Sequence, residues 1–134
     1  MLEQDKKELA RGYYEKAVDE LNLVRFCEKS GKYNLLISRM YYYIFNLCRT
    51  IMVLEDEDTK SHKTLMGNFN RIMIHERGIF DKSYGSLLTT LEKQRGLCDY
   101  EANYRIDKDF ALYLAEQGET MGEDLSQYIT ARIN

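Results

Sequence analysis

Arginine and tyrosine are the residue types in this sequence whose spacing could support chemistry. Arg39 and Tyr42 lie in the segment SRMYYYIFNLCRTI, and Arg95, Asp99 and Tyr100 lie in the segment RGLCDY. A guanidinium group binds phosphate through paired hydrogen bonds and stabilises the negative charge that develops during phosphoryl transfer. Tyrosine rings can stack on bases. These residues therefore suggest a site for a ligand that contains phosphate.

Metal chemistry and phosphate-loop chemistry are poorly supported by the remaining reactive groups. The two histidines, His62 and His75, are not spaced to pair with a carboxylate or a cysteine, and no HExxH or Glu-x-x-His pattern occurs. No glycine-rich phosphate loop is present either. The three cysteines are far apart, so we expect neither a disulfide framework nor a zinc site. We therefore expect no metal and no cofactor.

The candidate side chains also have structural interpretations, which the sequence leaves open. Arg95 and Asp99 are four residues apart, so they could form an ion pair within one helix. A buried arginine is more often the structural partner of a carboxylate than a catalytic group. His62 lies beside Ser61 and Lys63 at the start of a predicted helix, where an exposed position is the default. Most of the eleven tyrosines are expected to pack in the core.

A central helix, predicted from Lys32 to Leu54, carries much of this chemistry. Two neighbouring apolar stripes at helical spacing indicate a helix in the middle of a bundle. The stripes comprise Leu36, Met40, Tyr43, Leu47, Ile51 and Leu54, and Tyr41, Phe45, Cys48 and Met52. A polar line on the same helix comprises Arg39, Tyr42, Asn46 and Arg49. Arginines on a buried helix require partners or a ligand.

Four further helices are predicted around the central one. The first covers Leu2 to about Lys29, and the second starts at Thr59 or Ser61 and ends near Glu76. The third is capped by Asp81 or Ser83 and ends before Glu101. The last covers about Lys108 to Ile133, with Asp107 as its cap. The chain has no proline and no alternating strand pattern. We therefore predict an all-α fold, an antiparallel four- to five-helix bundle that forms one domain over residues 1–134.

Several finer features of the outer helices are also predicted. Gly31 and Gly78 are expected to end helices in the left-handed conformation. In the first helix, periodicity places Leu9 on the inward face and Glu20 on the outward face. Gly118 and Gly122 are expected to weaken the last helix.

Composition limits the class of protein. The charged fraction of 31% and the hydrophobic fraction of 44% are typical of a globular domain. The net charge of −3 gives no overall basic field for nucleic acid, although a local arginine pocket can act inside an acidic chain. The N-terminus lacks the apolar run of a signal peptide, and no run of apolar residues is long enough to span a membrane. We therefore expect a cytoplasmic protein.

Three motifs in register resemble the HEPN family, in particular its small single-domain prokaryotic branch. The pattern of that branch is roughly S-R-x-Y-Y-x-x-F, then Ser-His followed by Phe, then R-x-x-x-D-Y. In this sequence the motifs are Ser38 to Phe45, Ser61-His62 with Phe69, and Arg95 to Tyr100. The match covers about half of the chain. It implies an α-helical bundle that forms a homodimer, with the last motif at or near the subunit interface.

The resemblance also implies a function. Many HEPN members are metal-independent RNA-cleaving toxins or phage-defence effectors, often encoded beside a minimal nucleotidyltransferase that neutralises them. Their catalytic signature is an arginine, four to six intervening residues and then a histidine. Arg95 is present here, but residues 96–106 contain no histidine and Tyr100 occupies the first of these positions. The candidate catalytic residues are therefore Arg95 with Tyr100 or with the non-sequential His62.

The primary prediction is a HEPN-domain protein of the toxin–antitoxin or phage-defence type. It would bind nucleotide or RNA through Arg39, Tyr42 and Asp99, as a homodimer with a nucleotidyltransferase partner. One alternative is an active metal-independent endoribonuclease toxin that uses Arg95 with His62 or Tyr100. Another alternative is a structural helical dimerisation module whose polar line only sets the packing.

Overall fold

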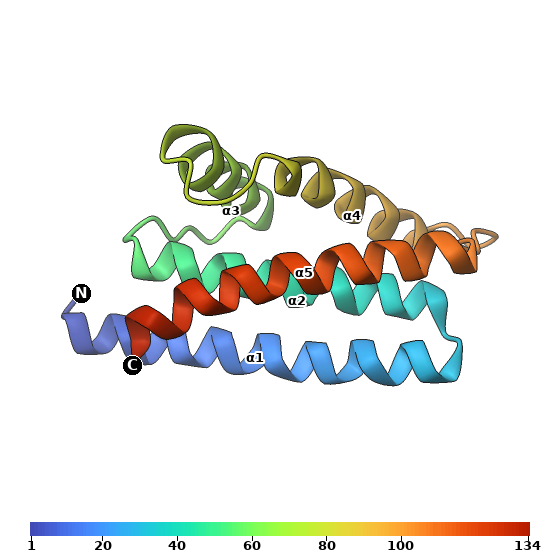
Figure 1. Cartoon of the computed structure of the whole chain (residues 1–134), viewed down its shortest axis with the longest axis horizontal. Helices are drawn as coiled ribbons and strands as arrows, with labels where there is room; N and C mark the ends of the chain where they lie inside the picture. Colours follow the sequence, from blue (N-terminus) through green and yellow to red (C-terminus); the bar gives the residue numbers. More distant parts are fainter.

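The computed structural model describes residues 1–134, and every regular element in it is a helix (Figure 1). The elements are α1 (Glu3–Ser30), α2 (Tyr33–Leu54), α3 (His62–Phe69), the π-helical segment η1 (Asn70–Glu76), α4 (Ser83–Tyr100) and α5 (Lys108–Ile133). The prediction of an all-α bundle is therefore confirmed. None of the helices has the length and apolar character needed to cross a membrane.

Helix α2 lies at the centre of the bundle and contacts α1, α3, α4 and α5. Helices α1 and α2 form an antiparallel hairpin, α5 runs along it, and α3 and α4 cover the remaining side of α2 (Figure 1). Both predicted apolar stripes of α2 are buried, as expected for the middle helix. The four members of its polar line are only partly buried, because they lie where α2 is not fully covered.

Helix ends follow the local sequence closely. Gly31 and Gly78 adopt φ angles of 72° and 62°, the left-handed conformation that glycine reaches without steric cost. Ser61, rather than Thr59, is the N-cap of α3, and its side chain accepts a hydrogen bond from the first turn. Asp107 caps α5 in the same way. The predicted ends of these helices are therefore confirmed. The predicted cap of the fourth helix, Asp81 or Ser83, is wrong, because the N-cap of α4 is Lys82, and Asp81 accepts a hydrogen bond from the Ser83 backbone instead.

Helix α1 packs on a face that differs slightly from the predicted one. Leu9 is 37% exposed, while Ala10, Ala17 and Val24 are fully buried. These small residues recur every seven positions, so α1 can approach α2 closely along them. The predicted inward position of Leu9 is wrong, and so is the outward position of Glu20, whose side chain is only 18% exposed.

The glycines of α5 face α2, and the helix continues through them without a break. A Cβ atom on Gly118 would collide with the Met40 side chain, and one on Gly122 would collide with the Tyr43 ring. These glycines therefore permit the close approach of α5 to α2, which the expectation of a weak helix did not include.

The segment predicted as one helix to Glu76 changes from α to π geometry at Asn70. Three consecutive residues, Ile72, Met73 and Ile74, are buried in the π-helical part. An α-helix would spread three consecutive side chains over about 200° of its circumference. The wider turn places all of them in the core, which the apolar spacing alone did not indicate.

Candidate functional site

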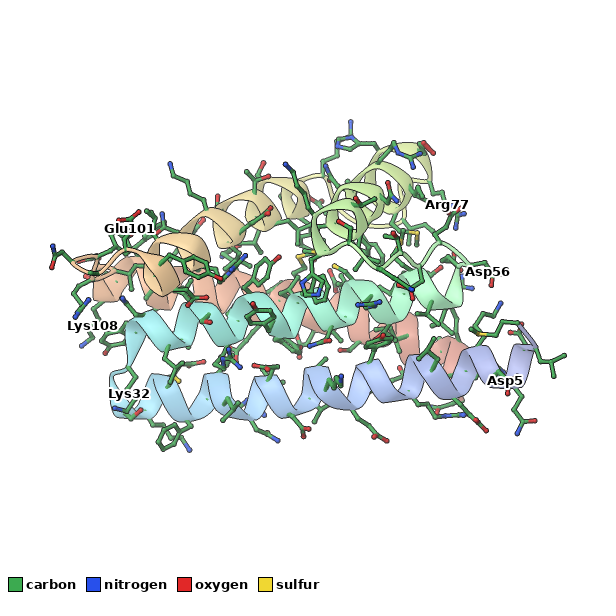
Figure 2. All side chains as sticks on the ribbon, turned by 180° about the vertical axis from the view of Figure 1, so that it is seen from behind. Asp5, Lys32, Asp56, Arg77, Glu101 and Lys108 are labelled. Carbon is green, nitrogen blue, oxygen red and sulfur yellow. The ribbon has the colours of Figure 1, made fainter.

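Helix α4 directs Arg95 toward α2. Tyr84, Leu88 and Leu91 precede Arg95 on the buried face of α4, at spacings of three and four residues. Arg95 continues that face, so its side chain is only 18% exposed. In Figure 2, α2 runs across the front of the molecule with α4 and α3 above it. The C-terminal part of α4, near the labelled Glu101, lies over the N-terminal half of α2.

Three tyrosine rings surround the Arg95 guanidinium. Its central carbon lies 4.7 Å from the centre of the Tyr41 ring, 5.9 Å from that of Tyr42 and 5.8 Å from that of Tyr100. Each distance allows an attractive cation–π contact. The one carboxylate that pairs with Arg95 is Asp99, and the Nη1–Oδ2 distance of 3.8 Å is long for a charged hydrogen bond. The buried Nε atom has no hydrogen-bond partner. The guanidinium is therefore only weakly paired through Nη1, while its Nε atom is buried, as are the Nε atoms of Arg39 and Arg49, which likewise have no hydrogen-bond partner.

The electrostatic surroundings keep Arg95 charged. Burial by itself lowers the pKa of Arg95, but Tyr42, Tyr41, Tyr100 and Asp99 together raise that pKa above its usual value. A partly buried cation with a raised pKa carries its charge throughout the physiological pH range. The site is therefore suited to an anionic group and not to proton transfer by Arg95.

Arg39 is paired with Glu20, which was not among the predicted site residues. Its Nη1 atom donates to both carboxylate oxygens of Glu20 on α1, at 3.0 and 3.1 Å. Burial raises the pKa of Glu20, and Arg39 only partly offsets this effect. Sequence spacing gave no signal for this contact, because Glu20 lies 11 residues before Gly31 and Arg39 lies eight residues after it. Arg39 is therefore largely neutralised by its own fold.

The Ser38 side chain connects Arg39 to Asp99, the carboxylate that pairs with Arg95. Its hydroxyl donates to Asp99 Oδ2 and accepts from Arg39 Nη2, both at 3.4 Å. The Tyr42 ring lies close to both guanidinium groups, 5.2 Å from Arg39 and 5.9 Å from Arg95. The structure thus brings five predicted site residues together. These are Arg39, Tyr42, Arg95, Asp99 and Tyr100.

His62 lies outside this cluster. It is exposed at the start of α3, and its ring centre is 4.1 Å from that of Phe45. The Phe45 ring stacks on the Tyr41 ring with 6.3 Å between the ring centres, and the Arg95 guanidinium lies over the Tyr41 ring. His62 forms no hydrogen bond or ion pair with Arg95. The rings of Phe45 and Tyr41 on α2 therefore lie between the candidate catalytic residues His62 and Arg95.

Arg49 and Asn46, the other members of the polar line, have structural contacts. Arg49 Nε lies 3.2 Å from Asp58 Oδ1, and its guanidinium carbon lies 4.7 Å from the centre of the Tyr13 ring. Asn46 donates to the backbone oxygen of Tyr42 within α2. Arg49 thus ties the loop after α2 to α1. This end of the polar line fixes the fold.

Groups that often bind metal do not converge in this chain. No set of three or more histidine, cysteine, aspartate and glutamate side chains is close enough to hold a metal ion. All three cysteines are free. Burial raises the pKa of Cys98 to about 11, so its thiol stays protonated and weakly nucleophilic at neutral pH.

Comparison with known proteins finds one informative similarity. No model of a known protein family matches the chain. Over 127 residues the sequence is 24% identical to a protein of Methanocaldococcus jannaschii named "Putative toxin MJ0142". The aligned region covers 95% of this chain and 85% of the relative. The similarity therefore extends over nearly the whole bundle and is not confined to one motif.

Proposed function

We propose that this protein is a HEPN-like component of a toxin–antitoxin or phage-defence pair, which binds a phosphate group of RNA or of a nucleotide at Arg95. The name of the archaeal relative supports a toxin-like role. The three motifs that resemble the HEPN family support the fold family and the RNA substrate. They are also the reason to propose a homodimer and a minimal nucleotidyltransferase as the antitoxin partner.

The observation that carries the proposal is the weak pairing of Arg95 compared with the other part-buried arginines. Arg39 lies 3.0 Å from Glu20, and Arg49 lies 3.2 Å from Asp58. Arg95 lies 3.8 Å from its carboxylate. A phosphate can approach Arg95 in two-point geometry without first breaking a strong ion pair. Among the part-buried arginines, Arg95 therefore has the longest contact with its carboxylate partner.

The surrounding tyrosines favour a nucleic acid over a simple anion. Tyr100 is 77% exposed at the rim, so a base could stack on its ring while the phosphate contacts Arg95. Tyr42 is half-buried between the two arginines and provides a second aromatic surface. Asp99 orients Arg95 and, through Ser38, connects it to Arg39. In this proposal Arg95, Tyr42 and Tyr100 contact the ligand, while Arg39 and Asp99 position them.

Fluorescence anisotropy with a labelled single-stranded RNA tests the proposal. Arg95→Ala should weaken binding about tenfold or more, because it removes a charged two-point contact. Arg71→Ala is a matched control, since Arg71 is exposed on η1 and its side-chain partners are Glu76 of η1 and Asn68 of the adjoining α3. Equal affinities for the wild type and Arg95→Ala would contradict the proposal. If Arg95→Ala lowers only the melting temperature, the site is a packing feature of a structural dimerisation module.

A metal-independent endoribonuclease is the second candidate function, and one observation favours it. The exposed His62 ring contacts Phe45, Phe45 stacks on Tyr41, and Tyr41 contacts the Arg95 guanidinium. A long RNA could contact the arginine and the histidine together. Cleavage of RNA in the presence of EDTA, abolished by both Arg95→Ala and His62→Ala, would support this candidate. Tyr100→Phe tests the tyrosine that occupies the usual histidine position.

The proposed assembly has its own tests. Light scattering of the purified protein gives its mass in solution, and a mass of one chain contradicts the homodimer. Co-purification with a co-expressed minimal nucleotidyltransferase tests the partner. An unrelated protein of similar size and charge serves as the control in that experiment.

A further inference from the structure

A pocket lies between α3, η1 and α4, and the geometry points to a base-binding subsite that favours an amine-bearing base. This inference rests on the proposed RNA binding at Arg95. The pocket has a volume of about 230 Å³ and is lined by Lys63, Asn70, Thr89 and Glu92 among others. Typical sites for drug-sized ligands exceed about 300 Å³. A pocket of this size suits one base and not a whole nucleotide.

An unsatisfied acceptor lies in the wall of this pocket. The Oδ1 atom of Asn70 is buried and has no hydrogen-bond partner. Buried polar atoms are nearly always paired in native proteins, so such an atom calls for an explanation. Gly85 on α4 is packed against it, because a Cβ there would lie only 2.7 Å from the Asn70 oxygen. A ligand that donates a hydrogen bond would remove the deficit once the amide rotates about its terminal torsion, which is a soft one.

The backbone at this position is also unusual. Asn70 is the first residue of the π-helical segment η1. π-Helical geometry is rare in proteins. Here the change of geometry begins where the helix contributes its amide to the pocket. The orphan acceptor and the altered helix thus coincide at one residue.

Helix α4 links this pocket to the Arg95 site. Glu92 lines the pocket and lies three residues before Arg95, so both are on neighbouring positions of one helical face. Burial raises the pKa of Tyr41, and the nearby Glu92 carboxylate raises that pKa further. The ring of Tyr41 is the one that lies closest to the Arg95 guanidinium. One nucleotide chain could therefore place a phosphate at Arg95 and a neighbouring base between α3 and α4.

The polar groups of the pocket predict which base would fit. Asn70 Oδ1, the Glu92 carboxylate and the Thr89 hydroxyl can all accept hydrogen bonds, and Lys63 is the one charged donor. Asparagine and glutamate accept from the exocyclic amines of adenine and cytosine in nucleic-acid complexes. Uracil presents a carbonyl oxygen in place of that amine. The subsite should therefore prefer cytosine over uracil, two bases of nearly equal size.

Binding of short oligonucleotides tests this inference. The probes are labelled hexamers of cytidine and of uridine with 2′-O-methyl groups, which cannot be cleaved through the 2′-hydroxyl. Wild-type protein should bind the cytidine hexamer about fivefold more tightly, the value of roughly one net hydrogen bond. Asn70→Leu should reduce this ratio below twofold and leave the affinity for the uridine hexamer unchanged. Arg95→Ala should weaken both probes by the same factor.

Matched variants on α4 control for indirect effects. Thr89→Val removes a hydroxyl from this pocket, whereas Thr90→Val removes one from a groove that faces α5. Only the first should lower the cytidine preference. Glu92→Ala alters an exposed residue and should also lower it, which gives a decisive result if Asn70→Leu fails to fold.

The outcomes separate this inference from the proposed function. If neither hexamer binds to the wild type, RNA binding at Arg95 is wrong and the subsite is wrong with it. If both bind equally, or if the cytidine preference survives Asn70→Leu and Glu92→Ala, the subsite is wrong and the Arg95 site stands.

Discussion

The guanidinium carbon of Arg95 lies 4.7 Å from the centre of the Tyr41 ring, which is itself only 3% exposed. Tyr41 belongs to α2 and Arg95 to α4, so this contact joins the two helices that form the candidate site. A buried ring provides a rigid surface, and the cation above it loses little further freedom when a phosphate binds. Tyr41 is therefore part of the site although its predicted role was packing.

The first prediction separates the ring of Tyr41 from its hydroxyl. Tyr41→Phe should bind RNA within about twofold of the wild type, because the aromatic face that supports Arg95 remains. Tyr41→Leu should weaken binding about fivefold, because Arg95 loses that face while its charge is retained. Anisotropy titrations of both variants measure the difference. If the two variants bind equally well, Tyr41 does not position Arg95.

The second prediction concerns the stability contributed by Arg39. Arg39→Ala should destabilise the fold by about 2 kcal/mol near neutral pH, because it leaves the carboxylate of Glu20 partly buried without its cation. Burial already raises the pKa of Glu20, and loss of Arg39 raises it further. A raised carboxyl pKa means that the folded state takes up a proton as the pH falls through that value. The destabilisation should therefore be larger at neutral pH than near pH 5.

Urea unfolding of wild type and Arg39→Ala at the two pH values measures this difference. The double variant Glu20→Leu with Arg39→Met is the control, since it removes both charges and retains apolar volume. It should cost less stability than Arg39→Ala alone. A pH-independent loss for Arg39→Ala would show that Glu20 does not carry the effect.

The helices were largely predictable from sequence because their signals are local. Gly31 and Gly78 end helices through their own conformational freedom, and Ser61 and Asp107 cap helices through hydrogen bonds to the next turn. The two apolar stripes of α2 likewise report burial through spacing alone. Such signals do not depend on which helices pack against each other.

The candidate site was only partly predictable because its contacts are between helices. The resemblance to a known motif pattern indicated that Arg39, Tyr42 and the Arg95 segment belong together, and the structure does bring them together. Glu20 was placed outward, because a charged residue on α1 reveals its partner only once the register with α2 is known. The acceptor of Asn70 was also not predictable, since it depends on the change to π geometry and on contact with Gly85.

The third prediction concerns the close contact of α5 with α2. Gly122→Ala should destabilise the protein by about 1–3 kcal/mol, because the added methyl group overlaps the ring of the buried Tyr43. Gly118→Ala should cost less, because the Met40 side chain that it meets is flexible.

Gly12→Ala serves as the control for helix propensity. Gly12 lies in α1, is exposed and has open space where its Cβ would be. The same change there should stabilise the protein by up to about 1 kcal/mol. Thermal unfolding of the three variants measures these effects. If Gly122→Ala is also stabilising, α5 and α2 are not packed as closely as described.

The fourth prediction concerns stability at alkaline pH. Burial first, and hydrogen bonding to Asp124 and Glu55 second, raise the pKa values of Tyr84 and Tyr128 to about 12. Unfolded tyrosine has a pKa near 10. Between about pH 10 and pH 12 the unfolded chain therefore loses protons that the folded chain retains, and unfolding becomes more favourable as the pH rises.

Each of these tyrosines should remove at most about 2.7 kcal/mol of stability across that range, and the contribution is fully present below pH 10. Denaturant unfolding from pH 9 to pH 11.5 should show a falling free energy of unfolding. Tyr84→Phe and Tyr128→Phe should each make the curve less steep, because phenylalanine has no proton to release. Tyr113→Phe, which alters an exposed tyrosine, should leave the slope unchanged. Equal slopes for all three variants would mean that other groups, such as the lysines, govern the alkaline loss.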